Sequence, residues 1–108
     1  MTRPSPVALA CALAFALGGG AATGAAATTY IVTIDGVKYE PEVLTVNRGD
    51  TVVWVNKDPF PHTVTARGAF DSRSIDAGKS WKYAAKKAGE YSYVCAFHPN
   101  MKGTLTVK

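Results

Sequence analysis

The sequence predicts an all-β protein, an antiparallel β-sandwich of about seven or eight short strands. Short segments alternate apolar and polar residues, the period of two that places successive side chains on opposite faces of a strand. Those segments are rich in β-branched and aromatic residues, and Gly, Pro, Asn and Asp recur between them as turn signals. No window shows a helical period of useful length.

The first half of the domain contains the most regular predicted strands. "TTYIVTID" (28–35) ends at the hairpin signal Asp35-Gly36, and "VKYEP" (37–41) resumes until Pro41 interrupts it. "EVLTV" (42–46) precedes a second turn at 47–50. "TVVWVN" (51–56) is the most apolar segment, which predicts a central strand, and "KDPFP" (57–61) predicts a rigid loop because of its two prolines.

The second half alternates short strands with irregular sequence. "HTVTA" (62–66) is a short predicted strand that ends before Gly68, and "FDSRSIDAGKS" (70–80) is irregular. "WKYAA" (81–85), "YSYVC" (91–95) and "GTLTVK" (103–108) are the remaining strands, with a turn at "KKAGE" (86–90). The predicted core contains Trp54, Val53, Val55, Ile31, Ile34, Leu44, Val46, Tyr91, Tyr93 and Leu105.

The first 27 residues have the layout of a secretory signal peptide. One cation, Arg3, precedes an apolar run from Val7 to Leu17 that is shorter than the ~20 residues needed to span a bilayer. The small residues 25–27 give an A-x-A cleavage pattern with Thr28 as the new N-terminus, although cleavage a few residues earlier, or an uncleaved anchor, is the alternative. We therefore expect one mature domain at 28–108, periplasmic and without stable membrane insertion.

Cleavage would leave a single cysteine, Cys95, because Cys11 is removed with the leader. The residue three before Cys11 is Ala8 and apolar sequence continues after it, so lipidation is not expected. An unpaired cysteine in an oxidising compartment is either a reactive liability or a metal ligand.

The charge pattern excludes nucleic acid as an expected partner. The full chain carries a formal net charge of +4, and Lys79, Lys82, Lys86 and Lys87 lie close together in sequence. Neither an Arg-rich block nor aromatic interleaving accompanies them. They are a solvated edge or a weak steering patch for an acidic partner.

Four residues together predict a copper site. Cys95, His98 and Met101 follow one another at intervals of three in "YVCAFHPNM", and His62 follows a Pro-rich loop more than thirty residues upstream. Two His, one Cys and a weak axial Met are the ligands of blue-copper centres. A structural zinc site would have four strong N or S ligands, and a thioether is a poor zinc ligand.

Each of these residues also has an ordinary structural interpretation. Cys95 alone could be a core thiol, His62 a capping residue, His98 a turn residue and Met101 a core filler. A C-x-x-H-x-x-M run after an alternating strand, with a Pro-His at another strand start, favours the metal site because packing alone does not demand it.

The chain resembles the cupredoxins, and among them the amicyanin and plastocyanin family. The resemblance lies in "VKYEPEVLTVNRGDTVVWVNKD", "PHTV" and "YSYVCAFHPNMKGTLTV", and the tight ligand spacing with Pro99 is similar to amicyanin. It implies that residues 28–108 form a cupredoxin domain, a Greek-key β-sandwich with one type 1 copper ion ligated by His62, Cys95, His98 and Met101. The implied function is one-electron transfer, Cu(II)/Cu(I), between periplasmic redox proteins.

Two departures from the family concern residues beside the ligands. Thr63 replaces the usual Asn after the upstream His, and its hydroxyl is expected to tie the two ligand segments together. Phe97 replaces the usual Pro before the loop His, and we expect its backbone N–H to donate a second hydrogen bond to the Cys95 thiolate. Such a donor would stabilise Cu(I), so Phe97→Pro would lower the potential.

The expected mechanism is outer-sphere electron transfer by a monomer, not enzymatic catalysis. His98 is the expected electron port, with Phe60, Pro59, Pro61 and Pro99 as an apolar rim that docks partners transiently. The partners would be cytochrome c-like proteins or a dehydrogenase or reductase. The alternatives are a periplasmic copper carrier, which would use the same four ligands, and an Ig-like interaction domain, which would not explain them.

Overall fold

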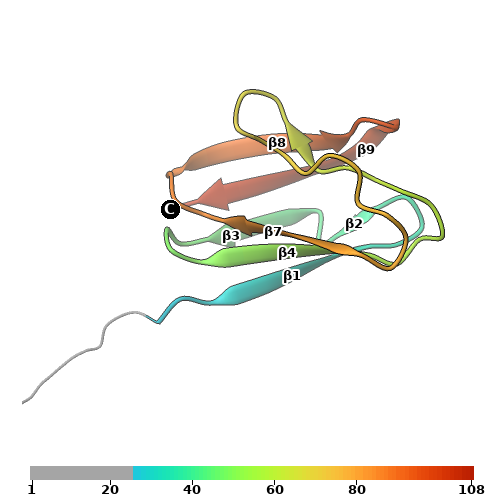
Figure 1. Ribbon diagram of the computed structural model, residues 1–108. Coiled ribbons are helices and arrows are strands. Elements are labelled where there is room, and N and C mark those ends of the chain that lie inside the picture. Colours follow the sequence, from blue (N-terminus) through green and yellow to red (C-terminus); the bar gives the residue numbers. More distant parts are fainter. Residues whose placement is uncertain (1–25) are drawn as a thin grey trace, which may run out of the picture.

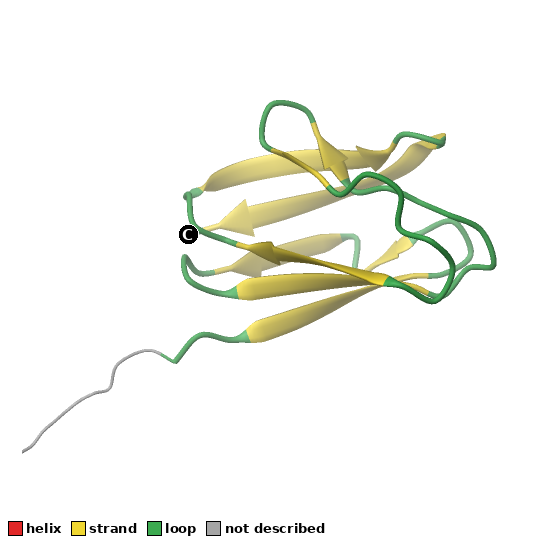
Figure 2. Ribbon diagram, in the orientation of Figure 1, coloured by secondary structure: helices red, strands yellow, loops and turns green. Residues whose placement is uncertain are grey.

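The structure, a computed structural model, describes residues 26–108, and the leader predicted at 1–27 lies almost wholly outside this range. The described part is built from strands and loops alone (Figures 1 and 2). It contains no helix that is long and apolar enough to cross a membrane. The strands are β1 (Thr29–Ile34), β2 (Tyr39–Glu40), β3 (Val43–Val46), β4 (Thr51–Asn56), β5 (Thr65–Ala66), β6 (Phe70–Asp71), β7 (Ser80–Ala84), β8 (Gly89–Cys95) and β9 (His98–Val107).

The strands form two sheets that face each other, which confirms the predicted β-sandwich. One sheet has the order β2-β1-β4-β7 and the other the order β3-β9-β8-β5-β6. Both are mixed, because β1 pairs parallel to β4 and β3 pairs parallel to β9. After β2 the chain crosses to the second sheet to form β3, and it then returns to the first sheet, where β4 runs beside β1 in the same direction. The alternation of apolar and polar residues does not reveal this parallel pairing.

The core follows the alternation of the strands more strictly than the predicted list. In β4, Val52 and Trp54 are buried while Val53 and Val55 are only half-buried. In β1, Val32 and Ile34 point inward and Ile31 is 53% exposed. Ile31 and Ile34 have opposite parity in one strand, so both cannot face the core, and including Ile31 was wrong.

Other core residues complete the correction. Leu44 and Tyr91 are half-buried and pack against the core, whereas Ile34, Val46, Trp54, Tyr93 and Leu105 are buried as predicted. The buried hydrophobic residues that the predicted list lacks are Val32, Tyr39, Val52, Val64, Ala66, Ile75, Ala85, Cys95, Met101 and Val107.

Aromatic rings join the two sheets at the centre of the core. The ring of Trp54 meets Tyr93 edge-on at 5.5 Å between centroids, and its Nε1–H donates to the Tyr93 hydroxyl at 3.3 Å. Tyr39 packs edge-on against the other side of Tyr93 at 4.7 Å. The Tyr93 ring lies so close to Gly103 that a Cβ there would come within 2.7 Å of Tyr93 Cε2. Glycine at 103 therefore lets β9 pass the ring.

Three connections meet at the end of the sandwich away from the C-terminus (Figure 1). They are the β1–β2 turn, the β4–β5 segment (57–64) and the short β8–β9 turn. The β1–β2 hairpin forms at Asp35-Gly36 as predicted. His62 is the first residue of the strand predicted at 62–66, but only Thr65–Ala66 of that strand is regular, and His62 makes an isolated bridge to Ile75. Side chains from distant parts of the chain thus meet at this end.

Candidate metal centre

Cys95 ends β8 and points into the protein. The β8–β9 register shifts between Val94 and Cys95, and Cys95 then pairs with His98 across a turn of two residues. A register shift of this kind re-aims a side chain at the end of a ladder. Cys95 is fully buried and makes no disulfide. His98 opens β9 and is half-buried.

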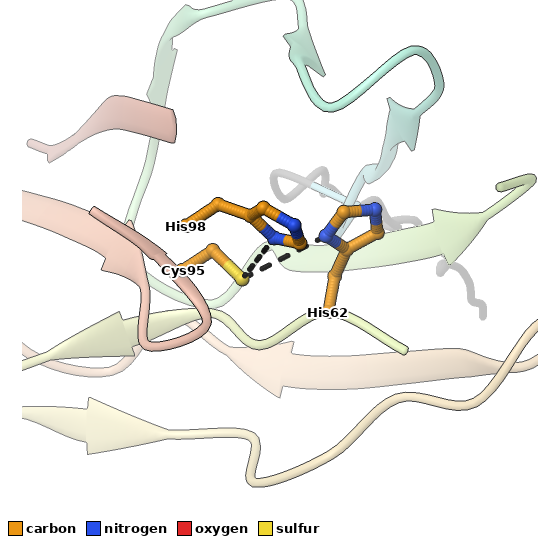
Figure 3. A group of neighbouring side chains, drawn as sticks. All are labelled: His62, Cys95 and His98. Carbon is orange, nitrogen blue, oxygen red and sulfur yellow. Dashed lines mark hydrogen bonds between the residues drawn. The ribbon is translucent and has the colours of Figure 1, made fainter. Parts of the chain in front are cut away.

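The upstream histidine completes a three-donor cluster. His62 is fully buried, and both its N–H and its C=O are engaged by Ile75. Its Nδ1 lies 3.7 Å from Cys95 Sγ, and His98 Nδ1 lies 3.7 Å from the same sulfur (Figure 3). The three donor atoms all lie within 4.8 Å of one another. The structure therefore brings together three of the four residues that the sequence predicted as ligands.

Met101 is the fourth predicted ligand. It is buried in β9, three residues after His98. His98 and Met101 line one surface depression, together with Val37, Phe97 and Pro99. Met101 thus lies on the strand that His98 begins and shares a surface depression with His98.

Thr63 links the two ligand segments. Its backbone N–H donates to Cys95 Sγ at 3.3 Å, and its hydroxyl accepts the N–H of Ala96 at 2.8 Å. The buried Tyr39 hydroxyl donates to the Thr63 carbonyl at 2.6 Å. Burial, with smaller contributions from Cys95 and Tyr93, raises the pKa of Tyr39 well above its usual value, so this hydroxyl stays a neutral donor. Thr63 is therefore held by Tyr39 as well as by the Cys95–Ala96 segment.

The hydrogen bond expected from Phe97 is not present. Among residues 26–108, the backbone amide that donates to the Cys95 sulfur is that of Thr63. The preceding amide, that of Ala96, is taken by the Thr63 hydroxyl, and the Phe97 side chain is 53% exposed at the tip of the turn. The sulfur faces the His62–Thr63 segment, which supplies its donor.

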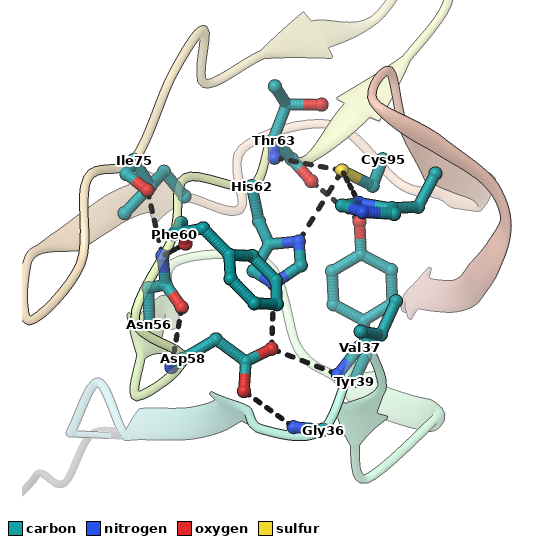
Figure 4. Close-up of polar contacts among 11 residues, drawn as sticks. Gly36, Val37, Tyr39, Asn56, Asp58, Phe60, His62, Thr63, Ile75 and Cys95 are labelled. Carbon is teal, nitrogen blue, oxygen red and sulfur yellow. Dashed lines mark hydrogen bonds and ion pairs between the residues drawn. The ribbon is translucent and has the colours of Figure 1, made fainter.

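Asp58 is a residue of the site that sequence reasoning missed. Its Oδ2 lies 2.7 Å from His62 Nε2, and it accepts the backbone N–H groups of Gly36 at 2.7 Å and Val37 at 2.9 Å (Figure 4). Burial alone would raise the pKa of Asp58, but these hydrogen bonds outweigh it and the pKa lies below its usual range. The four-residue spacing from Asp58 to His62 was the one available signal, and it is weak because a loop can take many conformations.

Asn56 holds the loop that carries Asp58. The fully buried side chain donates to the carbonyls of Phe60 and Ile75, both at 2.9 Å, and accepts the N–H of Asp58 at 2.9 Å. Asn56 therefore ties the segment between β4 and His62 to itself and to Ile75, the bridge partner of His62. Phe60 itself packs against both imidazoles, with centroids 5.2 Å from His62 and 6.0 Å from His98.

Phe60 and Pro99, two of the predicted docking residues, lie beside the more accessible imidazole, that of His98. Phe60 is 40% exposed, and Pro59, Pro61 and Pro99 are exposed as well. Val37 and Phe97, which were not predicted for this role, are also exposed large apolar side chains. Val37 comes from the distant β1–β2 turn, so its approach to the site depends on the fold.

The donor set fits a copper ion. Imidazole and thiolate are the borderline and soft ligands that suit copper, and the buried thioether of Met101, three residues after His98, is the residue type of the weak axial ligand in blue-copper sites. The hydrogen bond from His62 Nε2–H to the Asp58 carboxylate leaves the Nδ1 lone pair free to bind a metal. The Cys95 sulfur is buried but already has an N–H donor, which suits a thiolate.

Comparison with known proteins agrees with the fold. A family model described as a cupredoxin-like domain matches residues 7–107. Amicyanin from Paracoccus versutus is 31% identical, with 82% of this chain and 71% of the relative covered. Plastocyanin from Scenedesmus fuscus is 34% identical, with 65% of this chain and 86% of the relative covered.

Solved structures give the same picture. The Cu(I) form of an amicyanin variant has a TM-score of 0.72 at 30% identity, covering 78% of this chain and 86% of that one. A reduced amicyanin variant with phenylalanine in place of a proline has a TM-score of 0.70 at 31% identity, covering 74% and 82%. This chain belongs to the cupredoxin family.

Proposed function

We propose that this protein binds one copper ion through His62, Cys95, His98 and Met101 and carries single electrons between redox partners. The observation that carries the proposal is the cluster of two imidazole Nδ1 atoms and one thiol within 4.8 Å of one another. The similarity of the chain to amicyanin and plastocyanin, which are electron carriers, supports electron transfer rather than catalysis.

The chain's contribution would be to hold the donors in one geometry. A bound copper ion would alternate between Cu(II) and Cu(I) and so accept and release one electron. Cys95 and His62 are fully buried, and Thr63 binds both the sulfur and the turn that follows it. Donors held by packing and hydrogen bonds need to rearrange little when the charge of the site changes, which favours fast outer-sphere transfer.

His98 would be the electron port. It is half-buried, whereas His62 is sealed behind Asp58 and Phe60. Within residues 26–108, no protein group hydrogen-bonds to His98 Nε2, so this edge of the ring is free to face a partner. Phe60, Pro61 and Pro99 would provide the surface around it for transient contact with a c-type cytochrome, a dehydrogenase or a reductase.

The protein would work in the periplasm after removal of residues 1–27. Cleavage after Ala27 would make Thr28 the first residue, and its nitrogen lies 2.9 Å from Asp50 Oδ1. The new ammonium group would thus have a carboxylate partner. The Thr28 carbonyl accepts the N–H of Thr51 at 2.9 Å, so Thr28 is hydrogen-bonded to the sheet.

The test is the visible spectrum of residues 28–108 titrated with Cu(II), followed by ascorbate. We expect an intense blue band that saturates at one copper per chain, bleaches on reduction and returns on oxidation. Cys95→Ser should bind copper without the band, because the thiolate is its source, and serves as the matched control. A colourless protein that binds Cu(I) tightly would replace electron transfer with copper carriage, and no copper binding would overturn both.

A further inference from the structure

We propose that Asp58 is a positioning residue of the metal centre, a carboxylate clamped by the β1–β2 turn that fixes the His62 ring and favours the oxidised state of the site. This proposal rests on the proposed function, because the oxidised state is that of the copper ion. The contact itself is a property of the chain and can be tested without the metal.

Three donors converge on the one carboxylate. Oδ1 accepts Gly36 N–H at 2.7 Å, and Oδ2 accepts Val37 N–H at 2.9 Å and lies 2.7 Å from His62 Nε2. Asp58 is 6% exposed and His62 is fully buried. A buried carboxylate without partners is strongly unfavourable, so these contacts explain how this loop tolerates it. They also determine which imidazole nitrogen carries the proton.

The turn that clamps Asp58 adopts an unusual conformation. Gly36 and Val37 have φ of 65° and 60°, and Asp35 N–H bonds to the Lys38 carbonyl, as in a type I′ hairpin turn. Positive φ is normal for Gly36 but strained for a β-branched residue such as Val37. Two successive residues of positive φ here direct adjacent N–H groups at one anion. The strained residue, Val37, is thus also a residue whose N–H binds the Asp58 carboxylate.

The charge of Asp58 is not neutralised by a cationic side chain. Among residues 26–108, its single ion-pair partner is His62, and a neutral His62 donates only a hydrogen bond. The negative charge therefore acts on whatever binds at His62 Nδ1, across one imidazole ring. An anion at this distance stabilises the more positive oxidation state, and its hydrogen bond makes the imidazole a stronger donor. Both effects lower the reduction potential.

The first experiment compares the reduction potentials of copper-loaded wild type and Asp58→Asn. Asparagine keeps the size of the side chain and removes its charge. We expect the blue band to persist and the Cu(II)/Cu(I) equilibrium to shift about tenfold toward the reduced state, which corresponds to ~59 mV for one electron. The control is Asp35→Asn, which removes an equal charge from an exposed position in the same hairpin. An unchanged or lower potential, or an equal rise in the control, would overturn the proposal.

The second experiment uses wild-type protein without metal, so it stands even where the Asp58→Asn variant does not fold. Nitrogen NMR of the imidazoles reports which ring atom is protonated. We expect His62 to carry its proton on Nε2, with slow exchange, because Asp58 accepts it. A proton on Nδ1, or rapid exchange of Nε2–H, would refute the role of Asp58. This result is independent of copper, so it separates failure of this inference from failure of the proposed function.

Discussion

At the scale of single residues, Thr63 contributes three atoms to the site. Its N–H donates to Cys95 Sγ, its hydroxyl accepts from Ala96 N–H, and its carbonyl accepts from Tyr39. An asparagine is usual here in the family that the sequence resembles, and a shorter hydroxyl reaches the same neighbouring segment. The threonine side chain is long enough to join the two ligand segments because Thr63 and Ala96 lie close together.

We expect Thr63→Val to destabilise the protein by about 1–3 kcal/mol, the cost of leaving the Ala96 N–H without an acceptor. Valine has nearly the same shape, so packing changes little. Urea unfolding of the metal-free protein measures the loss, and Thr63→Ser, which keeps the hydroxyl, is the control. A loss in Thr63→Ser with no loss in Thr63→Val would show that the threonine methyl group, not the hydrogen bond, is what matters.

At the scale of elements, Asp50 joins the start of β1 to the β3–β4 turn. Its carboxylate accepts the N–H groups of Thr28 and Asn47, both at 2.9 Å. The hydrogen bond from Thr28, followed by that from Asn47, lowers the pKa of Asp50 and outweighs the effect of burial. Because the folded-state pKa is depressed, the ionised group stabilises the fold above its unfolded pKa of ~3.9. That stabilisation is lost as the pH falls through the folded-state pKa.

Asp50→Asn should therefore lower the urea midpoint at pH 7, and the difference from wild type should narrow as the pH falls below about 4. Urea unfolding at a series of pH values measures this, with Asp35→Asn as an exposed carboxyl control. A difference that stays constant with pH would mean that Asp50 acts through its shape and not through its charge.

At the scale of the whole molecule, the β4–β5 segment and the β8–β9 turn, which flank the candidate site, lie at one end of the sandwich (Figure 1). Phe60 packs on both imidazoles and is 40% exposed, so it can touch a partner while shielding the site. Ile31, on the outer face of β1, is 53% exposed and belongs to neither the site nor its rim. Substitutions at Phe60 and at Ile31 therefore distinguish an effect on partner docking from a general effect of surface charge.

Phe60→Glu should slow electron transfer to a c-type cytochrome on the order of tenfold while leaving the visible spectrum unchanged, because a desolvated charge opposes docking and touches no donor atom. Stopped-flow kinetics under second-order conditions measures the rate. Ile31→Glu introduces the same charge elsewhere and should leave the rate near that of wild type. If both variants are equally slow, or both unaffected, Phe60 has no docking role.

The sequence by itself determined the β class and the set of donor residues. Period-two alternation is a local property, and the C-x-x-H-x-x-M run places three donors within one short segment, so both can be seen in the sequence alone. The sequence also supplied His62 as the second imidazole that a blue-copper ligand set needs, and the family resemblance agreed with it. Copper binding by these residues stays a prediction until the spectrum is measured.

Only the tertiary structure decided which face of each strand is buried, where strands pair in parallel, and what lies behind His62. Alternation identifies two faces but not which one meets the other sheet, so Ile31 was misplaced while Val32 was missed. Asp58 lies in a loop, and Gly36 and Val37 lie about twenty residues away in another, so no local pattern connects them. Contacts between loops depend on how the sheets bring their ends together, and that is a property of the folded chain as a whole.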